Sequence, residues 1–382
     1  TGDASAATLS GGSESDSFDL NGFVLTGTID GGTSAADDDT LAGSDNYTLT
    51  AANGGETSLI TGGFSTIESL TGTAGDDTFT LNGGSVTGTL DGGLGDDVLS
   101  GSASYTVTSA DTGSATGVAL WQNIENLTGT TGNDTFTFNA GASLTGNARG
   151  LAGDDTFTLA GNAAAANLIG DADDDTFNLA GFVFTGAIDG RGTGSNQDVL
   201  TGASDYTVTG IDAGTSSQIN GTFVDIENLT GTSGADTFNF DAGSQLTGTA
   251  NGTGGADSFV LLGDAAAGSL QGAAGDDVFA LDGFTLTGAV DGGADSDFLT
   301  GADNYTVTGA NAGQSTRVTG NFTNIENLTG TANADSFVFH AGSSLSGNAA
   351  GLAEADTFVL SGNASVALLA GGGGDDTFNL AG

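Results

Sequence analysis

The chain has 382 residues and a formal net charge of −45, because 48 acidic residues face only three lysines or arginines. So few cations cannot neutralise phosphates, which disfavours nucleic acid as a partner and anionic membranes as a binding surface. The absence of cysteine excludes disulfides and thiolate chemistry, and 69 glycines without any proline disfavour both long helices and collagen. No run of 18 apolar residues occurs, so we expect no direct membrane insertion.

An aspartate followed two residues later by Phe or Leu recurs along the whole chain, at intervals of about 20 residues or about twice that. A fixed period of this length is typical of a solenoid, in which each repeat packs against its neighbours. We therefore expect residues 1–382 to form one continuous repeat domain. The repeat aspartates are Asp16, Asp39, Asp77, Asp97, Asp134, Asp155, Asp175, Asp198, Asp236, Asp257, Asp277, Asp297, Asp335, Asp356 and Asp376.

One repeat, residues 77–94, shows how a rung is built. Polar and apolar residues alternate over 78–81 and again over 86–90, and each run is followed by a turn rich in Gly, Asn or Asp. This pattern predicts two short strands per rung. The fold class is therefore all-β, a parallel β-solenoid of the β-helix or β-roll type with about 20 residues per rung and about 19 rungs. Stacking predicts an inner column made of Phe136, Phe157, Phe177, Leu200, Phe238, Phe259 and Phe279.

A longer period of about five rungs, or about 100 residues, lies on top of the rung period. Each of the four tyrosines starts a Y-T-[VL]-T segment and is followed by Ile-Glu-[Asn/Ser]-Leu-Thr-Gly-Thr. These segments fill the double-length gaps, where we expect one rung to lack the acidic turn. The tyrosines are Tyr47, Tyr105, Tyr206 and Tyr305, and the glutamates, which we expect to be structural rather than catalytic, are Glu68, Glu125, Glu227 and Glu326.

The acidic turn carries the candidate chemistry. Residues 92–100 and 371–379 fit the pattern G-G-x-G-x-D-x-U-x, where U is a large apolar residue. This resembles the RTX calcium-binding nonapeptide repeat of secreted bacterial proteins. Because only one turn per rung is acidic, the chain looks more like the single-column calcium repeats of giant bacterial surface adhesins.

The resemblance implies Ca²⁺ as the cofactor, held between stacked turns along one edge of the solenoid by carboxylate and backbone oxygens. The implied metal ligands are Asp77, Asp97, Asp134, Asp155, Asp175, Asp198, Asp236, Asp257, Asp277, Asp297, Asp335, Asp356 and Asp376. The alternative is that these aspartates only form turns. Carboxylates stacked every rung repel one another by about 1 kcal/mol per pair even in water, which favours a divalent ion.

Other functions have weaker support in the sequence. The carboxylates are spread evenly over the rungs instead of forming one pair, so we expect no enzyme, although a polysaccharide-active β-helix stays an alternative. His340 stands where sister repeats have Asn139 and Asp241, and is interpreted as neutral. Trp121 is expected to pack locally rather than to bind sugar. An ice- or glycan-binding face is a further alternative, but its threonine positions are irregular.

We predict a structural, calcium-stabilised repeat rod of a secreted bacterial surface protein, such as an adhesin, a biofilm-matrix protein or a filament. The chain starts and stops at the same phase of its repeat, which indicates a segment of a longer array. Equivalent end rungs also predict that copies of the chain stack head to tail.

Overall fold

The structure is a computed structural model that describes residues 2–33, 37–192 and 196–381. Within these ranges the chain contains strands and no helix, and the strands belong to two sheets of 21 strands each, called sheet A and sheet B. The expected all-β parallel solenoid is confirmed. Contacts divide the chain into two compact units, which are described separately: unit 1 comprises 1–178 and 182–196, and unit 2 comprises 179–181 and 197–382.

Unit 1 contains strands β1 to β21. Its sheet A strands are β1 (Ala4–Gly12), β3 (Leu25–Gly32), β5 (Asn46–Ala51), β6 (Gly54–Thr57), β7 (Ile60–Ser65), β9 (Thr78–Leu81), β11 (Val98–Ser100), β15 (Asn126–Thr128), β17 (Asn147–Ala152), β19 (Ala163–Ala172) and β21 (Phe184–Asp189). Its sheet B strands are β2 (Ser17–Asp19), β4 (Thr40–Ala42), β8 (Ser69–Thr71), β10 (Val86–Asp91), β12 (Ser104–Ser109), β13 (Thr112–Ala115), β14 (Val118–Gln122), β16 (Thr135–Phe138), β18 (Thr156–Leu159) and β20 (Thr176–Asn178).

Unit 2 contains strands β22 to β42. Its sheet A strands are β23 (Asp205–Val208), β24 (Gly214–Ser216), β25 (Ile219–Val224), β27 (Thr237–Phe240), β29 (Ser258–Leu261), β31 (Val278–Ala280), β33 (Phe298–Thr300), β37 (Asn327–Thr329), β39 (Ser344–Ala353) and β41 (Ser365–Gly373). Its sheet B strands are β22 (Val199–Thr201), β26 (Asn228–Thr230), β28 (Gln245–Asn251), β30 (Ala265–Ala274), β32 (Leu286–Ala294), β34 (Asn304–Gly309), β35 (Ala312–Ser315), β36 (Val318–Thr323), β38 (Ser336–Phe339), β40 (Thr357–Ser361) and β42 (Thr377–Ala381).

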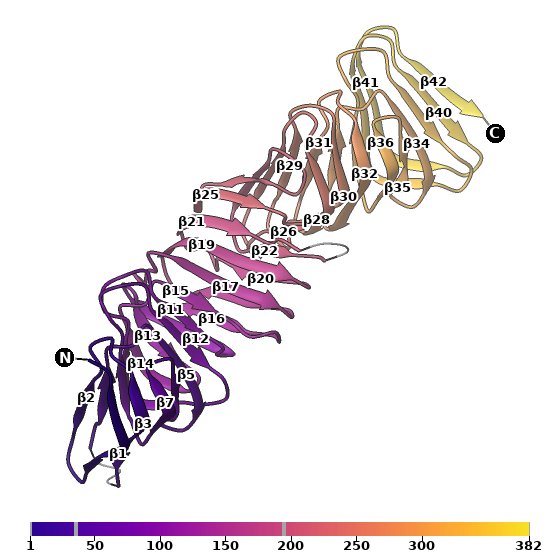
Figure 1. The fold of residues 1–382 in the computed structure, drawn as a ribbon. Coiled ribbons are helices and arrows are strands. Elements are labelled where there is room, and N and C mark those ends of the chain that lie inside the picture. The colour runs from indigo at the N-terminus through magenta and orange to yellow at the C-terminus, as the bar shows by residue number, and fades with distance from the viewer. Residues whose placement is uncertain (1, 34–36, 193–195, 382) are drawn as a thin grey trace. The chain divides into compact units, whose positions relative to one another are not determined.

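Each ordinary rung contributes one strand to each sheet, and equivalent strands of successive rungs pair in parallel (Figure 1). In unit 1, Phe136 of β16 stands opposite Phe157 of β18, and Phe157 opposite Phe177 of β20. Their rings stack with centroids 4.7 and 5.0 Å apart, inside the solenoid. Stacked buried rings bury a large apolar area and add favourable ring contacts, so the predicted aromatic column is the core of each rung stack.

The double-length gaps have a different origin from the one expected. Between β11 and β15 the chain forms an antiparallel meander in which β12 pairs with β13 and β13 pairs with β14. The meander lies inside sheet B, because β14 also pairs in parallel with β10, and β12 pairs in parallel with β16. One long coil with three strands in the same sheet therefore replaces the expected plain rung without an acid.

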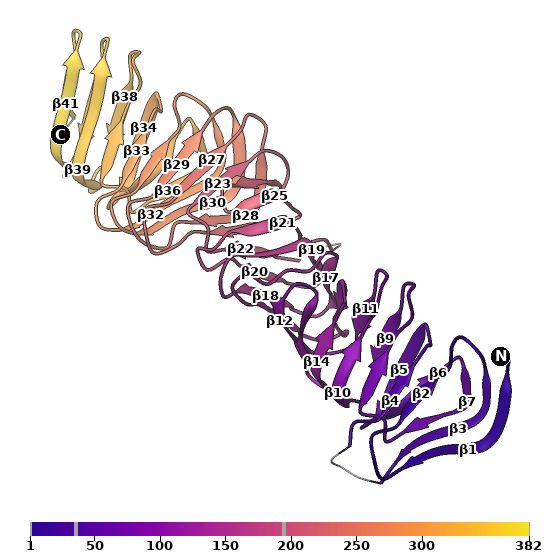
Figure 2. The same cartoon turned by 90° about the vertical axis from the view of Figure 1, so that its left-hand side faces the viewer.

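Among the described residues, each unit contains one meander in each sheet. In unit 1 the meander β5–β6–β7 lies in sheet A and β12–β13–β14 in sheet B. In unit 2 the meander β23–β24–β25 lies in sheet A and β34–β35–β36 in sheet B. Figure 2 shows β38, β39 and β41 in the yellow part of unit 2, where strands beyond the last meander stack regularly.

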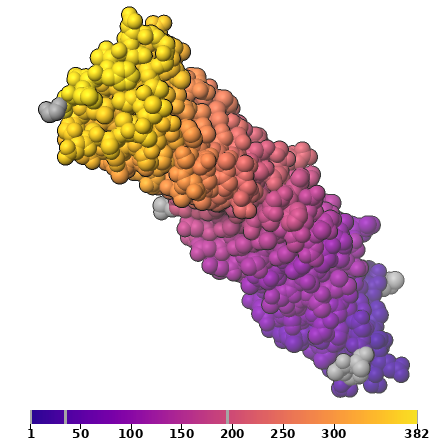
Figure 3. All heavy atoms as spheres, turned by 180° about the vertical axis from the view of Figure 1, so that it is seen from behind, coloured from indigo at the N-terminus to yellow at the C-terminus, as the bar shows by residue number. Residues whose placement is uncertain are grey.

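The outer surface follows this stacking. On the face shown in Figure 3, the colour changes gradually within each unit, since every rung covers only the rungs next to it in the chain. Polar side chains of the strands face outwards, while the inward positions are buried, as in β16, whose Phe136 and Phe138 are fully buried.

Candidate functional site: a buried carboxylate ladder

The repeat aspartates lie inside the turns and not on the surface. Twelve of the thirteen predicted metal ligands are buried, with at most 3% of the residue exposed, and Asp376 is half-buried. Each of these residues precedes a short strand, so the in-register stacking of those strands places the carboxyl groups one above another. The buried residues are Asp77, Asp97, Asp134, Asp155, Asp175, Asp198, Asp236, Asp257, Asp277, Asp297, Asp335 and Asp356.

Neighbouring rungs are joined through these carboxylates. The backbone N–H of Asp134 donates to Oδ1 of Asp155 at 2.8 Å, and the N–H of Asp155 donates to Oδ1 of Asp175 at 2.8 Å. In unit 2, the N–H of Asp257 donates to Oδ1 of Asp277 at 2.7 Å. We call this run of bonds the carboxylate ladder. Its direction is constant: a rung gives its amide hydrogen to the aspartate of the next rung in sequence.

A glycine five residues before the aspartate makes room for its carboxylate. A Cβ placed on Gly150 would overlap Oδ2 of Asp155, and a Cβ on Gly272 would overlap Oδ2 of Asp277. The motif G-x-x-x-x-D is therefore a packing requirement, because only glycine leaves space for the buried oxygen.

The glutamates of the Ile-Glu-[Asn/Ser]-Leu segments end the ladder. The N–H of Asp97 donates to Oε2 of Glu125 at 2.8 Å, and the N–H of Asp297 donates to Oε2 of Glu326 at 2.9 Å. The longer glutamate side chain supplies the acceptor where no aspartate is present. These bonds show how the glutamates fill the structural role that the sequence predicted for them. The sequence had not indicated that they accept the N–H of an aspartate from the preceding rung.

The first aspartate after each of these glutamates accepts no N–H from a preceding rung's aspartate and is capped locally. The threonine four residues earlier, in the Thr-Gly-Thr segment, donates both its N–H and its hydroxyl to the carboxylate. In Asp335 the bonds from Thr331 are 2.7 Å to Oδ2 and 3.0 Å to Oδ1. Thr73, Thr130 and Thr232 cap Asp77, Asp134 and Asp236 in the same way. Each capped carboxylate consequently has bonds to both of its oxygens.

The ladder changes sheet between the glutamate and the next aspartate. In unit 1, Glu125 precedes β15 of sheet A, whereas Asp134, nine residues later, precedes β16 of sheet B. In unit 2, Glu326 precedes β37 of sheet A and Asp335 precedes β38 of sheet B. The expectation of acidic turns along one edge is therefore wrong: nine residues are about half a rung, so the acid moves to the opposite edge.

We call each place where the acid changes sheet, between a glutamate and the next aspartate, a junction. A buried tyrosine connects the two sheets at each junction. Tyr305 of β34 in sheet B donates its hydroxyl to the carbonyl of Thr329 in sheet A at 2.7 Å and accepts the N–H of Ala302 at 3.3 Å. Its ring also stacks on Phe337, with centroids 5.2 Å apart. The other tyrosines repeat this arrangement, so the tyrosine starts each aromatic column where the ladder restarts.

The residue whose side chain faces the glutamate is asparagine at two of the four junctions and aspartate at the other two. Nδ2 of Asn311 donates to Oε1 of Glu326 at 2.6 Å, and Nδ2 of Asn53 donates to Oε1 of Glu68 at 2.7 Å. The equivalent residues of the other two junctions are acidic. They are Asp111, which faces Glu125, and Asp212, which faces Glu227, and all four positions share a left-handed φ between 45° and 52°.

Burial dominates the ionisation of the ladder. It raises the pKa of Asp155 and of Asp297 to about 7, and the pKa of Asp97 and of Asp257 to about 6, while the N–H from the preceding rung opposes the rise. Burial, opposed by the Thr130 cap, also raises the pKa of Asp134. A buried carboxylate without full hydrogen bonding disfavours its charged form.

Several ladder carboxylates keep one oxygen without a protein partner. Among the described residues, Oδ2 is buried and makes no hydrogen bond in Asp97, Asp155, Asp257, Asp277, Asp297 and Asp356. None of the threonine-capped aspartates belongs to this set. The orphaned oxygens therefore mark the inner positions of the ladder.

The donor set fits Ca²⁺ in kind, since carboxylate and glycine carbonyl oxygens are hard ligands. Oδ2 of Asp277 and the carbonyl oxygen of Gly292, in the next rung, both lie beside Gly272. A Cβ added to this glycine would contact both oxygens. In number the ladder supplies one carboxylate per rung, and no group of three acidic or histidine side chains suited to a metal occurs within residues 2–33, 37–192 and 196–381. Backbone carbonyls would have to provide most ligands, and calcium coordination stays a prediction.

Trp121 and His340, considered from the sequence as possible functional residues, have local contacts in the structure. Trp121 of β14 is fully buried against Gly113 of the meander, so the expected local packing is confirmed. His340 is exposed in a turn, where its carbonyl accepts the N–H of Ser343.

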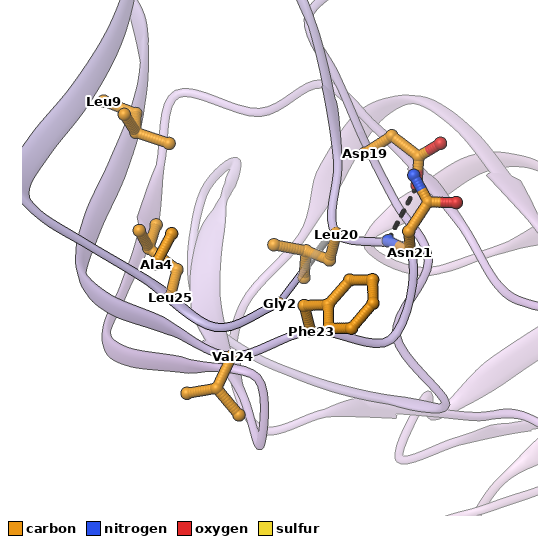
Figure 4. A pocket seen from close by; sticks show the side chains of 9 residues that line it. All are labelled: Gly2, Ala4, Leu9, Asp19, Leu20, Asn21, Phe23, Val24 and Leu25. Carbon is orange, nitrogen blue, oxygen red and sulfur yellow. Dashed lines mark hydrogen bonds between the residues drawn. The ribbon is translucent and has the colours of Figure 1, made fainter.

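A pocket of about 600 Å³ in unit 1 lies beside β1 and β3 (Figure 4). Leu9, Leu20 and Phe23 supply much of its apolar wall, and Asp19 is the one ionisable residue of its lining. Oδ1 of Asp19 accepts the N–H of Asn21 at 3.0 Å, as drawn in Figure 4. The lining comes from the two successive rungs that contain β1 and β3, and most of it is apolar.

No protein-family model matches the chain, and no curated protein sequence matches it. In the described part of the chain, no helix is long and apolar enough to cross a lipid bilayer.

Proposed function

We propose that this chain is a structural repeat segment of a secreted bacterial surface protein, such as an adhesin, a matrix protein or a filament. One observation carries the proposal: the repeated polar side chains are used to join rung to rung. The aspartates and glutamates accept backbone N–H groups of neighbouring rungs, and the tyrosine hydroxyls connect the sheets. A stack held by nearest-neighbour bonds tolerates any number of rungs, which suits an extended spacer.

Calcium stabilisation is part of the proposal. The inner ladder positions with an orphaned Oδ2, such as Asp155 and Asp277, would hold the ion together with glycine carbonyls of the next rung. A bound divalent cation would supply the positive charge that the chain lacks. It would favour the ionised carboxylates and, by binding only the folded chain, would stabilise it.

Far-UV circular dichroism of the chelator-treated chain during a calcium titration tests this proposal. We expect a cooperative gain of β-structure or a higher unfolding temperature. Asp155→Asn should reduce the number of bound calcium ions measured by equilibrium dialysis, whereas Asp134→Asn, at a capped position, should leave it unchanged. Full β-structure in chelator with no response to calcium would refute the calcium part and leave an apolar, hydrogen-bonded stack.

Self-association of this segment is also proposed, following from the repeat of equivalent rungs. Sedimentation velocity in calcium should detect species larger than the monomer. A single monomeric species over a wide concentration range would contradict it.

A further inference from the structure

A second cavity lies in unit 2, at the junction that contains Glu326. Its volume is about 720 Å³, within the usual range of ligand pockets. The walls come from the turn at 282–283, the end of β33, the loop 329–334 and Leu352 of β39, and Asp303 and Arg317 also line it. The lining contains no ladder carboxylate, although Thr331, which caps Asp335, is part of it.

Asp303 and Arg317 form a bidentate ion pair in this pocket. Nε of Arg317 donates to Oδ1 of Asp303 at 3.2 Å, and Nη2 donates to Oδ2 at 3.1 Å. The hydroxyl of Thr316 donates to the same Oδ1 at 2.7 Å. Partial burial opposes the effect, but the bonds from Thr316 and Arg317 lower the pKa of Asp303, so its carboxylate stays charged at neutral pH.

The ion pair keeps hydrogen-bonding capacity for a ligand. A guanidinium has five N–H groups, and the pair with Asp303 occupies two of them. Nη1 of Arg317 makes no hydrogen bond within the described residues, and about a third of the Arg317 side chain is exposed. Donors of the guanidinium and acceptors of the carboxylate therefore lie side by side at the pocket.

The sister junctions show that the fold does not require this pair. The equivalent residues are Asp45 and Leu59, Ala103 and Gly117, and Ser204 and Gln218. At the third of these junctions Oε1 of Gln218 accepts the N–H of Ser204 at 2.7 Å, which joins the same two strand ends without any charge. Since neutral pairs serve the backbone equally well, the ion pair of the fourth junction is available for another role.

The charged residues of the pocket favour a neutral ligand over an anion or a cation. An anion would meet Asp282, Asp303 and the field of a chain with net charge −45, and a cation would meet Arg317. A neutral ligand with adjacent hydroxyls avoids both, because each hydroxyl both donates and accepts a hydrogen bond. Leu352, which is 52% exposed, offers an apolar surface in the same pocket.

We propose that this pocket binds a neutral sugar, with two neighbouring hydroxyls on the Asp303–Arg317 pair and a ring face on Leu352. The proposal adds a ligand to the structural role and does not depend on calcium.

Saturation-transfer NMR with cellobiose, maltose, lactose and diacetylchitobiose at millimolar concentrations tests the proposal on the full chain. We expect saturation transfer to at least one of these neutral disaccharides and a smaller effect for glucuronate, which carries a charge. The double variant Asp303→Ser/Arg317→Gln copies the Ser204–Gln218 pair, so its fold should be retained and its affinity should fall at least about tenfold.

Leu352→Thr, which copies Thr253 of a sister repeat, tests the apolar contact while leaving the ion pair intact. We expect a reduction of about threefold to tenfold. Absence of transfer to every neutral sugar would overturn the proposal. Equal binding by the folded double variant, or tighter binding of glucuronate than of the neutral sugars, would overturn it as well.

Discussion

Each unit contains one junction at which asparagine faces the glutamate and one at which aspartate does. In unit 1 these are Asn53 with Glu68 and Asp111 with Glu125. The backbone is the same in both, because the N–H of Ile67 and of Ile124 donates to the carbonyl of the variable residue in each case. Exchange of one amide nitrogen for an oxygen thus converts a hydrogen bond into a carboxylate pair.

The junction has two separable properties, its backbone path and its stability. The backbone path depends on the tyrosine, the left-handed turn and the glutamate that ends the ladder, which all four junctions share. The stability of each junction depends additionally on whether the glutamate receives a donor or a like charge. Asp111 and Asp212 keep the turn because their Oδ1 still accepts the N–H of Thr145 and of Thr247, at 2.8 and 2.7 Å.

Glu326→Ala should have the largest effect. It removes the acceptor of the Asp297 N–H and of Asn311 Nδ2, and each unsatisfied buried donor costs about 1–3 kcal/mol. We expect the opening free energy of the Asp297 amide to fall by about 3 kcal/mol in native-state hydrogen exchange, which reports local stability in a repeat stack.

Glu125→Ala is the matched comparison at an aspartate junction. It should cost less at the Asp97 amide, because it also removes a carboxylate from beside Asp111. Glu326→Gln, which retains an acceptor oxygen, should recover most of the loss. Equal losses at the two junctions would show that the facing side chain does not matter.

Asp111→Asn should stabilise its junction by about 1 kcal/mol, since it supplies the donor that Asn53 and Asn311 provide elsewhere. Asn311→Asp should destabilise the fourth junction by a similar amount. Hydrogen exchange of the Asp97 and Asp297 amides measures both effects.

Asp264→Asn is a control for the change in net charge. Asp264 is exposed and accepts the N–H of Thr285 at 2.8 Å, as Asp111 accepts that of Thr145. If Asp264→Asn stabilised the chain as much as Asp111→Asn does, general charge repulsion and not the junction would explain the gain.

Acidification should reduce the difference between the two kinds of junction, with a smaller effect than the substitutions. Burial, together with Asp111 and Asp212, raises the pKa of Glu125 and Glu227. A raised pKa means that the folded chain binds a proton before the unfolded chain does. This stabilisation is complete below the unfolded-state pKa of about 4.3 and is lost as the pH rises through the folded-state value.

Hydrogen exchange of the Asp97 amide, corrected for intrinsic rates, should be compared in the unmodified chain and in Asp111→Asn. As the pH falls from 7 to 5, the amide of the unmodified chain should gain more protection than that of the variant. A constant difference across this range would contradict the ionisation of the pair.

The strand pattern and the inner column were predictable because Phe and Leu recur two residues after each aspartate. The direction of the carboxylates was not, since Asp is an ordinary turn residue whether it faces inwards or outwards. The glycine that stands five residues before most of these aspartates was the available signal, because a recurring residue without a side chain indicates a buried neighbour.

The sheet switch also had a signal in the sequence. Each glutamate of the Ile-Glu-[Asn/Ser]-Leu segments is followed by an aspartate after nine residues, which is half a rung and cannot continue the same column. The meander was not predictable from alternation. β12 alternates like a parallel strand, whereas β13 buries a single position and β14 buries Val118 and Trp121, three residues apart, so neither shows the period of two. Strand order is set by long-range pairing, which local pattern does not record.

The constant direction of the carboxylate ladder gives the stack a chemical polarity. A rung that settles on its C-terminal neighbour finds a carboxylate ready for its amide hydrogen, as Asp335 finds Oδ1 of Asp356 at 2.8 Å. A rung that packs on its N-terminal neighbour accepts that neighbour's N–H with its own carboxylate. Its own amide N–H stays unpaired until the next rung is added. Growth towards the N-terminus would therefore leave an unpaired carboxylate oxygen on the newest rung, and growth towards the C-terminus would leave an unpaired amide N–H, so the two growing ends of this coil are chemically different.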